Sequence, residues 1–552
     1  MKRAVWLAIV ALLISFVAHG GQSNSVSSQQ ARTFRTTSRI VAVDVVVTDH
    51  AGHPVTNLTA DDFAVFEDGV QQKIASFESP TARSVASQES DKPAPASGRT
   101  EISENSSPTI FLLDELNTQF WDTAYGRFEL GKLLQRQPEL QRPAAILRLT
   151  LHGLVLVSDY TRDAGALQAA LKRAEPQSVA LMARGKTALM AERVNTSLKA
   201  LDQIAVANEG PKGRKNLIWV GSGFRFVSEI VASSGDPSAT QLLKAIHDTA
   251  ARLQDAHVSV YVLDPRGITV FPDGYVPMNG ASPQSENMHT GQDAMLLQGE
   301  IMQTGGSGVG AGYVAFQDTA GDIVLESVAD ETGGQVLPAR NDLDGQMAHV
   351  IVDGQSYYSL SYYPSNKNWN GAFRKIRVRV RQAGLIVRAR SGYFANDDSK
   401  AAGDSTSVAV IHAMGSPVPY VGIAFDAAAK MSATPQKSLE FALQIEARSL
   451  SWSKTPGGDL TAQVTIVIAD FSTAGVLLRH QVSDRELTIA SQKLPKTSSE
   501  IVVTGPVSMA AKTEMLPAEA SRIRLVVLDK TTGRIGTRDL PTNQIAGYPL
   551  SK

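Results

Sequence analysis

A short apolar stretch that ends in an aspartate is the first place where this sequence could carry chemistry. In FLLDELNTQF, residues 111–120, Asp114 closes the apolar run, and Leu116 and Thr118 follow it at two-residue spacing. Carboxylate and hydroxyl oxygens are ligands for hard cations such as Mg²⁺. Short polar side chains at such a position also satisfy free N–H groups at the start of a helix. The stretch therefore predicts either part of a metal site or a loop that leads into a helix.

A second candidate position follows another apolar run. Gly221-Ser222-Gly223 comes directly after NLIWV, residues 216–220. In open α/β sheets, ligands bind at the carboxyl ends of strands where the strand order reverses. Asp114 and Ser222 are therefore the positions to examine for a bound ligand.

Other motifs favour structural interpretations. GSGVGA, 306–311, fits a dinucleotide loop, but no strand precedes it, and the region 270–316 is rich in Gly, Ser, Gln and Met. That composition predicts a flexible insertion. His50 and His53 lie in a turn, where they are either exposed to solvent or bind a metal together. The sequence contains no Gly-x-Ser-x-Gly and no His-Glu-x-x-His motif, so we expect no catalytic residues and no enzyme activity.

The elements that must position these residues alternate between strand and helix. Helical apolar spacing is seen after Asp114 at Phe120, Tyr125, Phe128 and Leu133. The pattern predicts a largely parallel sheet covered by helices on both faces, with one antiparallel hairpin around His152-Gly153. Its expected strands are 108–114, 145–151, 154–160, 216–223, 257–264, 356–364 and 373–382, and its expected helices are 120–135, 163–174, 192–209, 238–256 and 317–332.

Two of those strands carry distinctive side chains. In the first, tyrosines lie close together, and we expect one pair in the core and the other under a helix. In the second, basic and aliphatic side chains alternate, which predicts a half-exposed strand rather than a phosphate-binding patch. The residues are Tyr357, Tyr358, Tyr362 and Tyr363 in the first strand, and Lys375, Arg377, Arg379 and Arg381 on one face of the second.

The remaining segments divide the chain into further parts. Residues 1–20 have a basic start, an apolar core and small residues at a possible cut, typical of a secretory signal peptide or else of an uncleaved anchor. No later segment is apolar enough to span a membrane. Residues 36–80 predict a small β module that leans on another domain, with a capping box at Thr59 and Asp62. Flexible linkers are expected at 81–106 and 398–408, and an immunoglobulin-like β-sandwich at 409–552.

Composition excludes several function classes. The chain has 552 residues, 43% apolar and 19% charged, which is ordinary for globular protein. Its 53 basic and 54 acidic residues give a net charge of −1, so nothing predicts nucleic acid or an anionic membrane surface as a partner. The absence of cysteine excludes disulfides, thiolate zinc sites, a cysteine nucleophile and a lipid-modified cysteine.

The order of several motifs resembles the von Willebrand factor A-related domain of secreted bacterial proteins, known chiefly from acidobacteria. The motifs that carry the resemblance over residues 36–397 are VVVTDHAGHPVTNLTADDFAVFEDG, FLLDELNT, LVLVSDYTRD, GRKNLIWVGSGF, HVSVYVLDPRG, ADETGGQ, SYYSLSYYPSNKNWNGAFRKIRVRVR and RARSGYF. The resemblance implies an α/β, Rossmann-like domain with six strands in the order 3-2-1-4-5-6, and ligand binding that often uses a metal. RIRLVVLDKTTGRIGT also resembles C-terminal modules seen behind this domain.

The resemblance further implies a metal-ion-dependent adhesion site, which this chain matches only in part. The family pattern has Asp-x-Ser-x-Ser after the first strand, a Thr from a later loop and an Asp after the fourth strand. Asp114 matches the first position, Thr118 the last hydroxyl and Thr187 the loop Thr, while Ser222 stands in place of the second Asp. Leu116 replaces the middle Ser. The implied site is degenerate and would bind Mg²⁺ or another divalent cation weakly; alternatively, Asp114, Asn117 and Thr118 cap the following helix.

Taken together, these features predict an exported binding or adhesion module. The expected partner is a protein or a ligand of the cell envelope, and the expected location is secreted, periplasmic or otherwise extracytoplasmic. The alternatives are a metal-free structural scaffold in an envelope assembly and, less favoured, a hydrolase with an unrecognised arrangement.

Overall fold

The computed structural model describes residues 40–80, 108–174, 186–210, 213–221, 223, 237–266, 326–338, 340–395, 406–431, 438–490, 506–514, 517 and 519–545. The predicted signal peptide at 1–20, the linker at 81–106 and the insertion at 270–316 lie outside these residues. No helix in the described part of the chain is long and apolar enough to cross a membrane.

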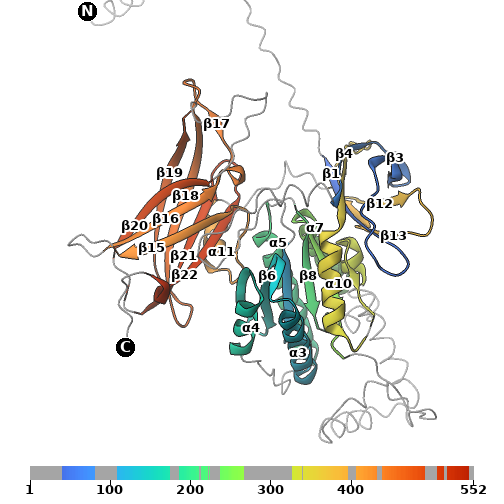
Figure 1. Ribbon diagram of the computed structural model, residues 1–552, viewed down its shortest axis with the longest axis horizontal. Coiled ribbons are helices and arrows are strands. Elements are labelled where there is room, and N and C mark those ends of the chain that lie inside the picture. Colours follow the sequence, from blue (N-terminus) through green and yellow to red (C-terminus); the bar gives the residue numbers. More distant parts are fainter. Residues whose placement is uncertain are drawn as a thin grey trace, which may run out of the picture. The chain divides into compact units, whose positions relative to one another are not determined.

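The central element is a mixed sheet, of which Figure 1 labels β6 and β8. Its strand order, within the described residues, is β10-β9-β8-β5-β6-β7. Neighbouring strands are parallel except for the β6–β7 hairpin at one edge. When the strands are numbered 1 to 6 along the chain from β5 and the sheet is read from the β7 edge, the order is 3-2-1-4-5-6. The expected topology and the expected hairpin are therefore confirmed. The strands are β5 (Thr109–Asp114), β6 (Glu139–Thr150), β7 (Gly153–Asp163), β8 (Lys215–Val220), β9 (Val258–Leu263) and β10 (Gln335–Val336).

Helices cover both faces of this sheet, so its middle strands are buried throughout. In β5, Ile110 and Leu112 pack in the same core as α5 and α7, whereas Phe111 and Leu113 pack with α3, α4 and α10. That alternation is the reason why a continuous apolar run can form this strand. The helices are α3 (Phe120–Arg136), α4 (Ala164–Arg173), α5 (Lys186–Ala207), α7 (Pro237–Asp255) and α10 (Leu343–Gln355), with a further helical turn at 326–331.

A smaller β region is formed by strands from both ends of residues 36–397, the span over which the sequence resembles the family. Its sheets have the orders β13-β1-β11-β4 and β14-β12-β2-β3 among the described residues. The sequence placed 356–382 in the main α/β domain and 36–80 in a separate module, whereas the pairing of β1 with β11 joins the two segments. The strands are β1 (Val41–Thr48), β2 (Phe63–Glu67), β3 (Val70–Gln72), β4 (Ile74–Glu78), β11 (Tyr357–Tyr362), β12 (Phe373–Val380), β13 (Ile386–Ala389) and β14 (Gly392–Phe394).

The physical reason for this pairing is burial. The valines of β1 need apolar partners, and Tyr358 and Tyr362 of β11 share their core. Tyr357 is buried as well, whereas Tyr363 is half exposed, so the expected division into two buried pairs is wrong. The alternation expected for β12 is confirmed at Ile376, which is buried, and at Arg377, which is exposed.

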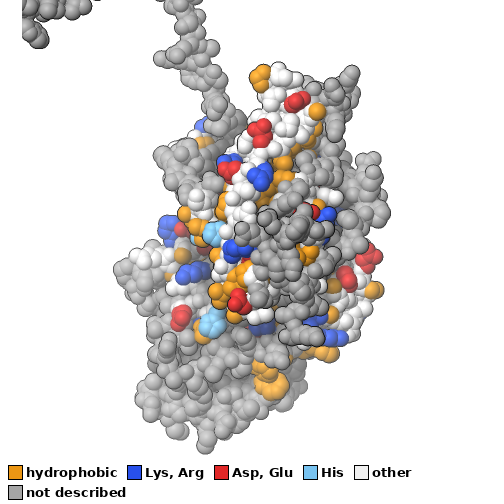
Figure 2. Space-filling view, turned by 90° about the vertical axis from the view of Figure 1, so that its left-hand side faces the viewer, with side chains coloured by type: hydrophobic (Ala, Val, Ile, Leu, Met, Phe, Trp, Pro, Cys, Tyr) orange, Lys and Arg blue, Asp and Glu red, His pale blue; other side chains and the backbone are white. Residues whose placement is uncertain are grey.

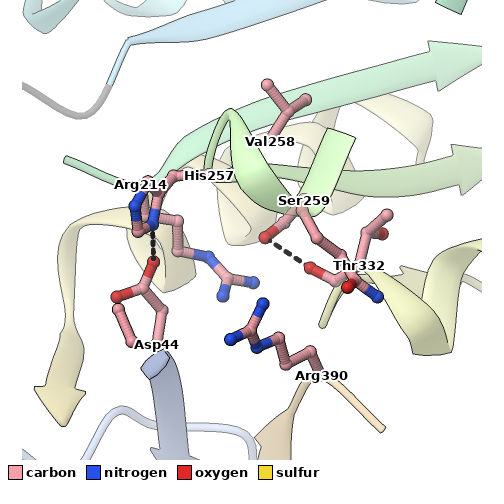
Figure 3. A pocket seen from close by; sticks show the side chains of 9 residues that line it. Asp44, Arg214, His257, Val258, Ser259, Thr332 and Arg390 are labelled. Carbon is pink, nitrogen blue, oxygen red and sulfur yellow. Dashed lines mark hydrogen bonds and ion pairs between the residues drawn. The ribbon is translucent and has the colours of Figure 1, made fainter. Parts of the chain in front are cut away.

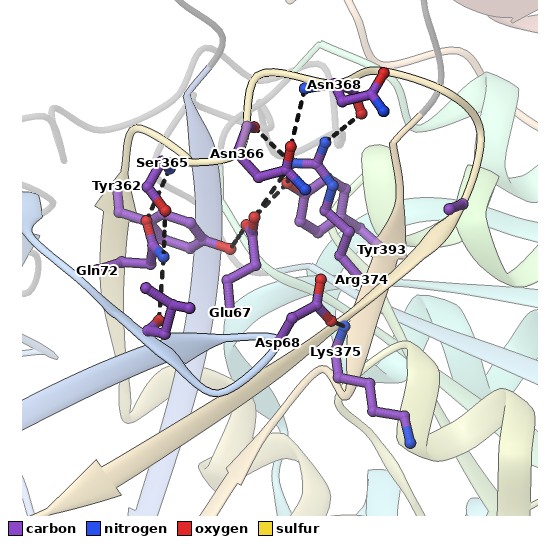
Figure 4. A network of polar contacts seen from close by, with 12 residues as sticks. Glu67, Asp68, Gln72, Tyr362, Ser365, Asn366, Asn368, Arg374, Lys375 and Tyr393 are labelled. Carbon is purple, nitrogen blue, oxygen red and sulfur yellow. Dashed lines mark hydrogen bonds and ion pairs between the residues drawn. The ribbon is translucent and has the colours of Figure 1, made fainter.

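A buried polar network ties these strands together (Figure 4). Glu67 at the end of β2 accepts hydrogen bonds from Tyr362 Oη at 2.7 Å, Tyr393 Oη at 2.9 Å and Arg374 Nη1 at 3.1 Å. Burial and the neighbouring Glu67 raise the pKa of both tyrosines, which keeps them protonated as donors. Nearby, the backbone N of Thr59 donates to Asp62 Oδ2 at 2.8 Å before the short helix η1 (Ala60–Asp62).

The C-terminal region consists of antiparallel sheets, as the β-like runs predicted. One apolar cluster contains side chains from β15 and β16 of one sheet and from β18 and β21 of the other. The linker expected at 398–408 ends earlier than predicted, because helix α11 (Thr406–Gly415) begins inside it and buries Val410 and Ala413. The other elements are β15 (Phe425–Met431), β16 (Ser438–Glu446), η4 (Ala447–Ser449), β17 (Ser453–Lys454), β18 (Leu460–Ser472), β19 (Leu477–Ile489), β20 (Pro506–Glu514), β21 (Ala520–Asp529), β22 (Ile535–Pro541) and η6 (Thr542–Gln544).

The outer surface of this region mixes charge with apolar groups. Strand β19 exposes Val482 between charged side chains of both signs, including Asp484 and Arg485. Figure 2 shows basic, acidic and apolar side chains interspersed on the face that it views. Charged side chains of this kind on an edge strand disfavour its pairing with a strand of another chain.

Candidate functional site

Asp114 is the last residue of β5 and is fully buried. Its Oδ1 accepts from the backbone N of Leu116 at 3.1 Å and of Asn117 at 2.8 Å. Its Oδ2 accepts from Trp219 Nε1 at 2.9 Å and from Asn117 Nδ2 at 3.0 Å. Both oxygens of the carboxylate are therefore engaged by protein donors from the loop and from the neighbouring strand β8.

The groups around Asp114 shift the pKa of its carboxyl group in opposite directions. Burial raises the pKa of Asp114 above its ordinary value, although the hydrogen bonds from Asn117 and Trp219 and the positive charge of Arg193 oppose the shift. Arg193 is a buried residue of α5 that donates from Nη2 to the carbonyl oxygen of Leu116. The cation thus holds the loop by its backbone and partly balances the carboxylate.

The end of β8 approaches the loop closely. A Cβ added to Gly221 would lie 2.4 Å from Cβ of Asp114 and 2.7 Å from Oγ1 of Thr118. Only glycine leaves room for these two buried side chains at that distance. Thr118 therefore packs between the ends of β5 and β8.

These residues do not fit the divalent-cation site that the family resemblance implies. Each Asp114 oxygen already accepts protein hydrogen bonds, and the side chain of Leu116 is 0% exposed within the apolar core. The described residues contain no group of three or more His, Cys, Asp or Glu side chains that could hold a metal. Thr187 lies in the first turn of α5 with its side chain outside the described part, and Ser222 lies outside it altogether, so their assignment as ligands stays a prediction. The hydrogen bonds of Asp114 lie within the loop, so they favour the alternative role of turning the chain. The expected helix cap is wrong, because the N-cap of α3 is Gln119, which makes no side-chain capping hydrogen bond.

Glu115, the residue after Asp114, points toward α3 and β6. Its Oε1 lies 3.2 Å from Nε of Arg148 on β6 and 3.6 Å from Nη1 of Arg127 on α3. All three side chains are largely buried. This cluster attaches α3 to the sheet, and no spacing in the sequence indicated it.

Helix α3, which follows the loop, exposes large aromatic side chains. Trp121 and Phe128 are each 63% exposed and Phe120 is 41% exposed. The rings of Phe120 and Trp121 lie 5.5 Å apart in an edge-to-face arrangement. The sequence assigned Phe120 and Phe128 to an apolar stripe of this helix, but the residues that it buries are Thr123, Gly126, Glu129, Leu130, Leu133 and Leu134.

Comparison with known proteins finds similarity in structure but none in sequence. No family model and no curated protein matches the sequence. Among solved structures, one neighbour is a VWA domain. It is the SpRpn10 VWA domain, 13% identical, with 29% of this chain and 75% of that chain covered and a TM-score of 0.17. Another is the β-glucuronidase of Bacteroides uniformis, 8% identical, with 34% of this chain but only 19% of that chain covered and a TM-score of 0.13. With scores this low, neither neighbour bears on what this chain does.

Sequence reasoning located the loop but missed the groups that engage it. Trp219 lies inside an apolar strand, where an indole is ordinarily a core side chain, and Gly221 was noted only as a neighbour of Ser222. The available signal was topological. Because β5 and β8 are adjacent and parallel, their carboxyl ends must meet, and a buried indole N–H needs an acceptor there.

Proposed function

We propose that this chain is an exported binding module with a von Willebrand factor A-like domain, and that it binds a protein of the cell envelope. The observation that carries the proposal is the exposure of Phe120, Trp121 and Phe128 on the helix that begins beside the Asp114 loop. Phe120 and Trp121 begin this helix at the edge of the sheet where open α/β sheets bind ligands, and Trp is a frequent hot spot of protein interfaces. Export is supported by the signal-like residues 1–20.

Binding through this surface would not depend on a divalent cation. In metal-dependent sites the cation keeps an open position for a carboxylate of the partner. Here the one acidic side chain in place, Asp114, is buried and hydrogen-bonded on both oxygens. The partner would instead contact the aromatic side chains of α3. We assign no catalytic activity to the chain.

The test begins with the full-length protein, which is immobilised and used to isolate binding proteins from the envelope of the producing cell. The affinity of each purified partner is then measured for wild type, Trp121→Ala and Val482→Ala, with folding checked by circular dichroism. Val482 is a matched control because it is a 55% exposed apolar residue on β19.

We expect Trp121→Ala to weaken binding by about 30-fold, since a hot-spot truncation costs about 2 kcal/mol, and Val482→Ala to change it less than about twofold. We also expect EDTA to leave the affinity unchanged. Equal affinities for wild type and Trp121→Ala, or complete loss of binding in EDTA, would overturn the proposal.

A further inference from the structure

A polar cavity lies at the end of the sheet opposite to Asp114 and Gly221. It is found where β8 and β9 begin, and it has a volume of about 20 Å³. That volume exceeds the roughly 10–15 Å³ needed for one water molecule. The side chains that matter for its chemistry are Asp44, Arg214, His257, Ser259, Thr332 and Arg390 (Figure 3).

Two arginines from different parts of the fold meet in this cavity. Arg214 precedes β8 and is 1% exposed, and Arg390 follows β13 of the small β region. Figure 3 shows their guanidinium groups directed toward one another. Like charges that face one another in a buried space repel strongly, because little water screens them. The arrangement therefore calls for a negative group between them.

Each of these arginines has a buried donor that remains unused. Arg214 donates from Nη2 to Tyr261 Oη at 2.9 Å and to the carbonyl oxygen of Gly333 at 2.6 Å, but its Nε has no hydrogen-bond partner. The buried Nε of Arg390 has none either. Buried donors are nearly always paired in folded proteins, so two unpaired donors at one cavity indicate a missing acceptor.

Protein carboxylates balance only part of this positive charge. Asp44 on β1 is the acidic residue that lines the cavity, and its Oδ2 lies 3.3 Å from His257 Nδ1. Asp255 at the end of α7 also attracts Arg390, but it is exposed and does not line the cavity. Lys215, next to Arg214, is buried too and donates from Nζ to the carbonyl oxygen of Ala256 at 2.8 Å. One lining carboxylate thus faces two guanidinium groups and an imidazole.

The walls of the cavity are fixed by their own hydrogen bonds. Ser259 Oγ donates to the carbonyl oxygen of Thr332 at 2.9 Å, and Thr332 Oγ1 accepts from the backbone N of Val260 at 3.0 Å. His257 has a φ of 55°, in the left-handed region that a non-glycine residue rarely adopts. Residues held in such conformations cluster at ligand sites, where rigid walls reduce the entropy lost on binding.

We propose that this cavity binds one small oxyanion, phosphate or sulfate, between the guanidinium groups of Arg214 and Arg390. Guanidinium groups recognise the oxygens of such anions through charge-assisted hydrogen bonds, and each arginine still has an unpaired Nε–H group. The anion would link the start of β8 to the end of β13. Binding would therefore stabilise the fold.

The test is thermal unfolding of the full-length protein with inorganic phosphate or sulfate, compared with sodium chloride at equal ionic strength. We expect a saturable rise in Tm with either oxyanion and none with chloride. Arg390→Gln should weaken the apparent affinity about tenfold or more, whereas Arg377→Gln, an exposed arginine of β12 with the same charge change, should leave it unaltered. A parallel arm with phosphoserine distinguishes a free ion from a phosphate monoester, since stabilisation by phosphoserine would extend the ligand to such esters.

A second variant tests the proposal even if Arg390→Gln fails to fold. Asp44→Asn removes the competing carboxylate and should tighten oxyanion binding measured by calorimetry, a gain that a damaged fold cannot produce. Equal effects of oxyanion and chloride at matched ionic strength would overturn the proposal. So would equal phosphate affinities of wild type and Arg390→Gln, or weaker binding by a folded Asp44→Asn.

Discussion

Trp219 Nε1 donates a hydrogen bond of 2.9 Å to Oδ2 of Asp114, and both side chains are fully buried. The bond connects the carboxyl end of β8 with the end of β5, at the edge of the sheet where a ligand would be expected. It gives the buried indole N–H an acceptor and the buried carboxylate a donor. Each group therefore depends on the other for stability.

Replacement of Trp219 by Phe tests this dependence. The substitution keeps an aromatic ring but removes the donor to a buried carboxylate, so we expect the free energy of unfolding to fall by about 2 kcal/mol. Urea denaturation measures the change. Trp121→Phe on the exposed surface of α3 is the control and should stay within about 0.5 kcal/mol of wild type. Equal losses in both variants would mean that the indole bond contributes nothing.

The close approach of Gly221 to the loop predicts a steric effect. Gly221→Ala places a methyl group 2.4 Å from Cβ of Asp114, and we expect it to destabilise the protein by about 1–3 kcal/mol or more. Gly131→Ala in α3 is the matched substitution, because no atom lies within 4 Å of the added methyl group. That variant should be more stable by about 0.5–1 kcal/mol, as alanine favours the helix. Chemical denaturation measures the free energy of unfolding of both variants. A value for Gly221→Ala equal to that of wild type would contradict the close packing of Gly221 against the loop.

The pair of His247 and Glu331 predicts a dependence of stability on pH. His247 Nδ1 lies 2.7 Å from Glu331 Oε1, and the interaction with this carboxylate raises the pKa of the imidazole above its ordinary value of 6.5. A raised folded pKa means that the pair stabilises the protein fully below the unfolded pKa. The contribution is lost as pH rises through the folded pKa. Stability should therefore fall as the pH rises above about 6.5 through the folded pKa, and His247→Gln should flatten that part of the profile.

Thermal unfolding across this pH range measures the slope for both proteins. Glu331→Gln should flatten the same interval, because it removes the other partner. An unchanged slope in His247→Gln would show that another group titrates there.

The network around Glu67 predicts that the two segments of the small β region unfold together. Glu67→Gln removes the charge that pairs with buried Arg374 and should cost about 3 kcal/mol or more. We expect hydrogen exchange to accelerate in both β1 and β11, which are paired but distant in the chain. Faster exchange confined to residues 40–80 would contradict a shared folding unit.

The sequence predicted those parts of the fold that depend on local pattern. The strands β5, β8 and β9 are short apolar runs bounded by polar residues, and a sheet covered on both faces needs such runs. The pairing of β1 with β11 was not predictable in this way. Val41 and Tyr362 face each other in the sheet but are far apart in the chain, and no local pattern specifies such a partner.

The loop and the helix after β5 show the same limit. Apolar spacing alone suggested that Phe120 and Phe128 are part of a packed stripe, but the sheet and α10 receive the Leu130 and Leu133 side instead. Asp114 could be placed at the strand end from the sequence. Its donors, Trp219 and Asn117, depend on how two strands and a turn meet in space.

Titration of Mg²⁺, Mn²⁺ and Ca²⁺ into the full-length protein, followed by calorimetry, tests directly whether Asp114 shapes the loop or binds a cation. We predict no saturable binding tighter than about millimolar, because a single, fully hydrogen-bonded carboxylate compensates little of a divalent charge. Asp114→Asn should lower the free energy of unfolding equally with and without the cations. Saturable binding by wild type that Asp114→Asn abolishes while remaining folded would contradict a structural role.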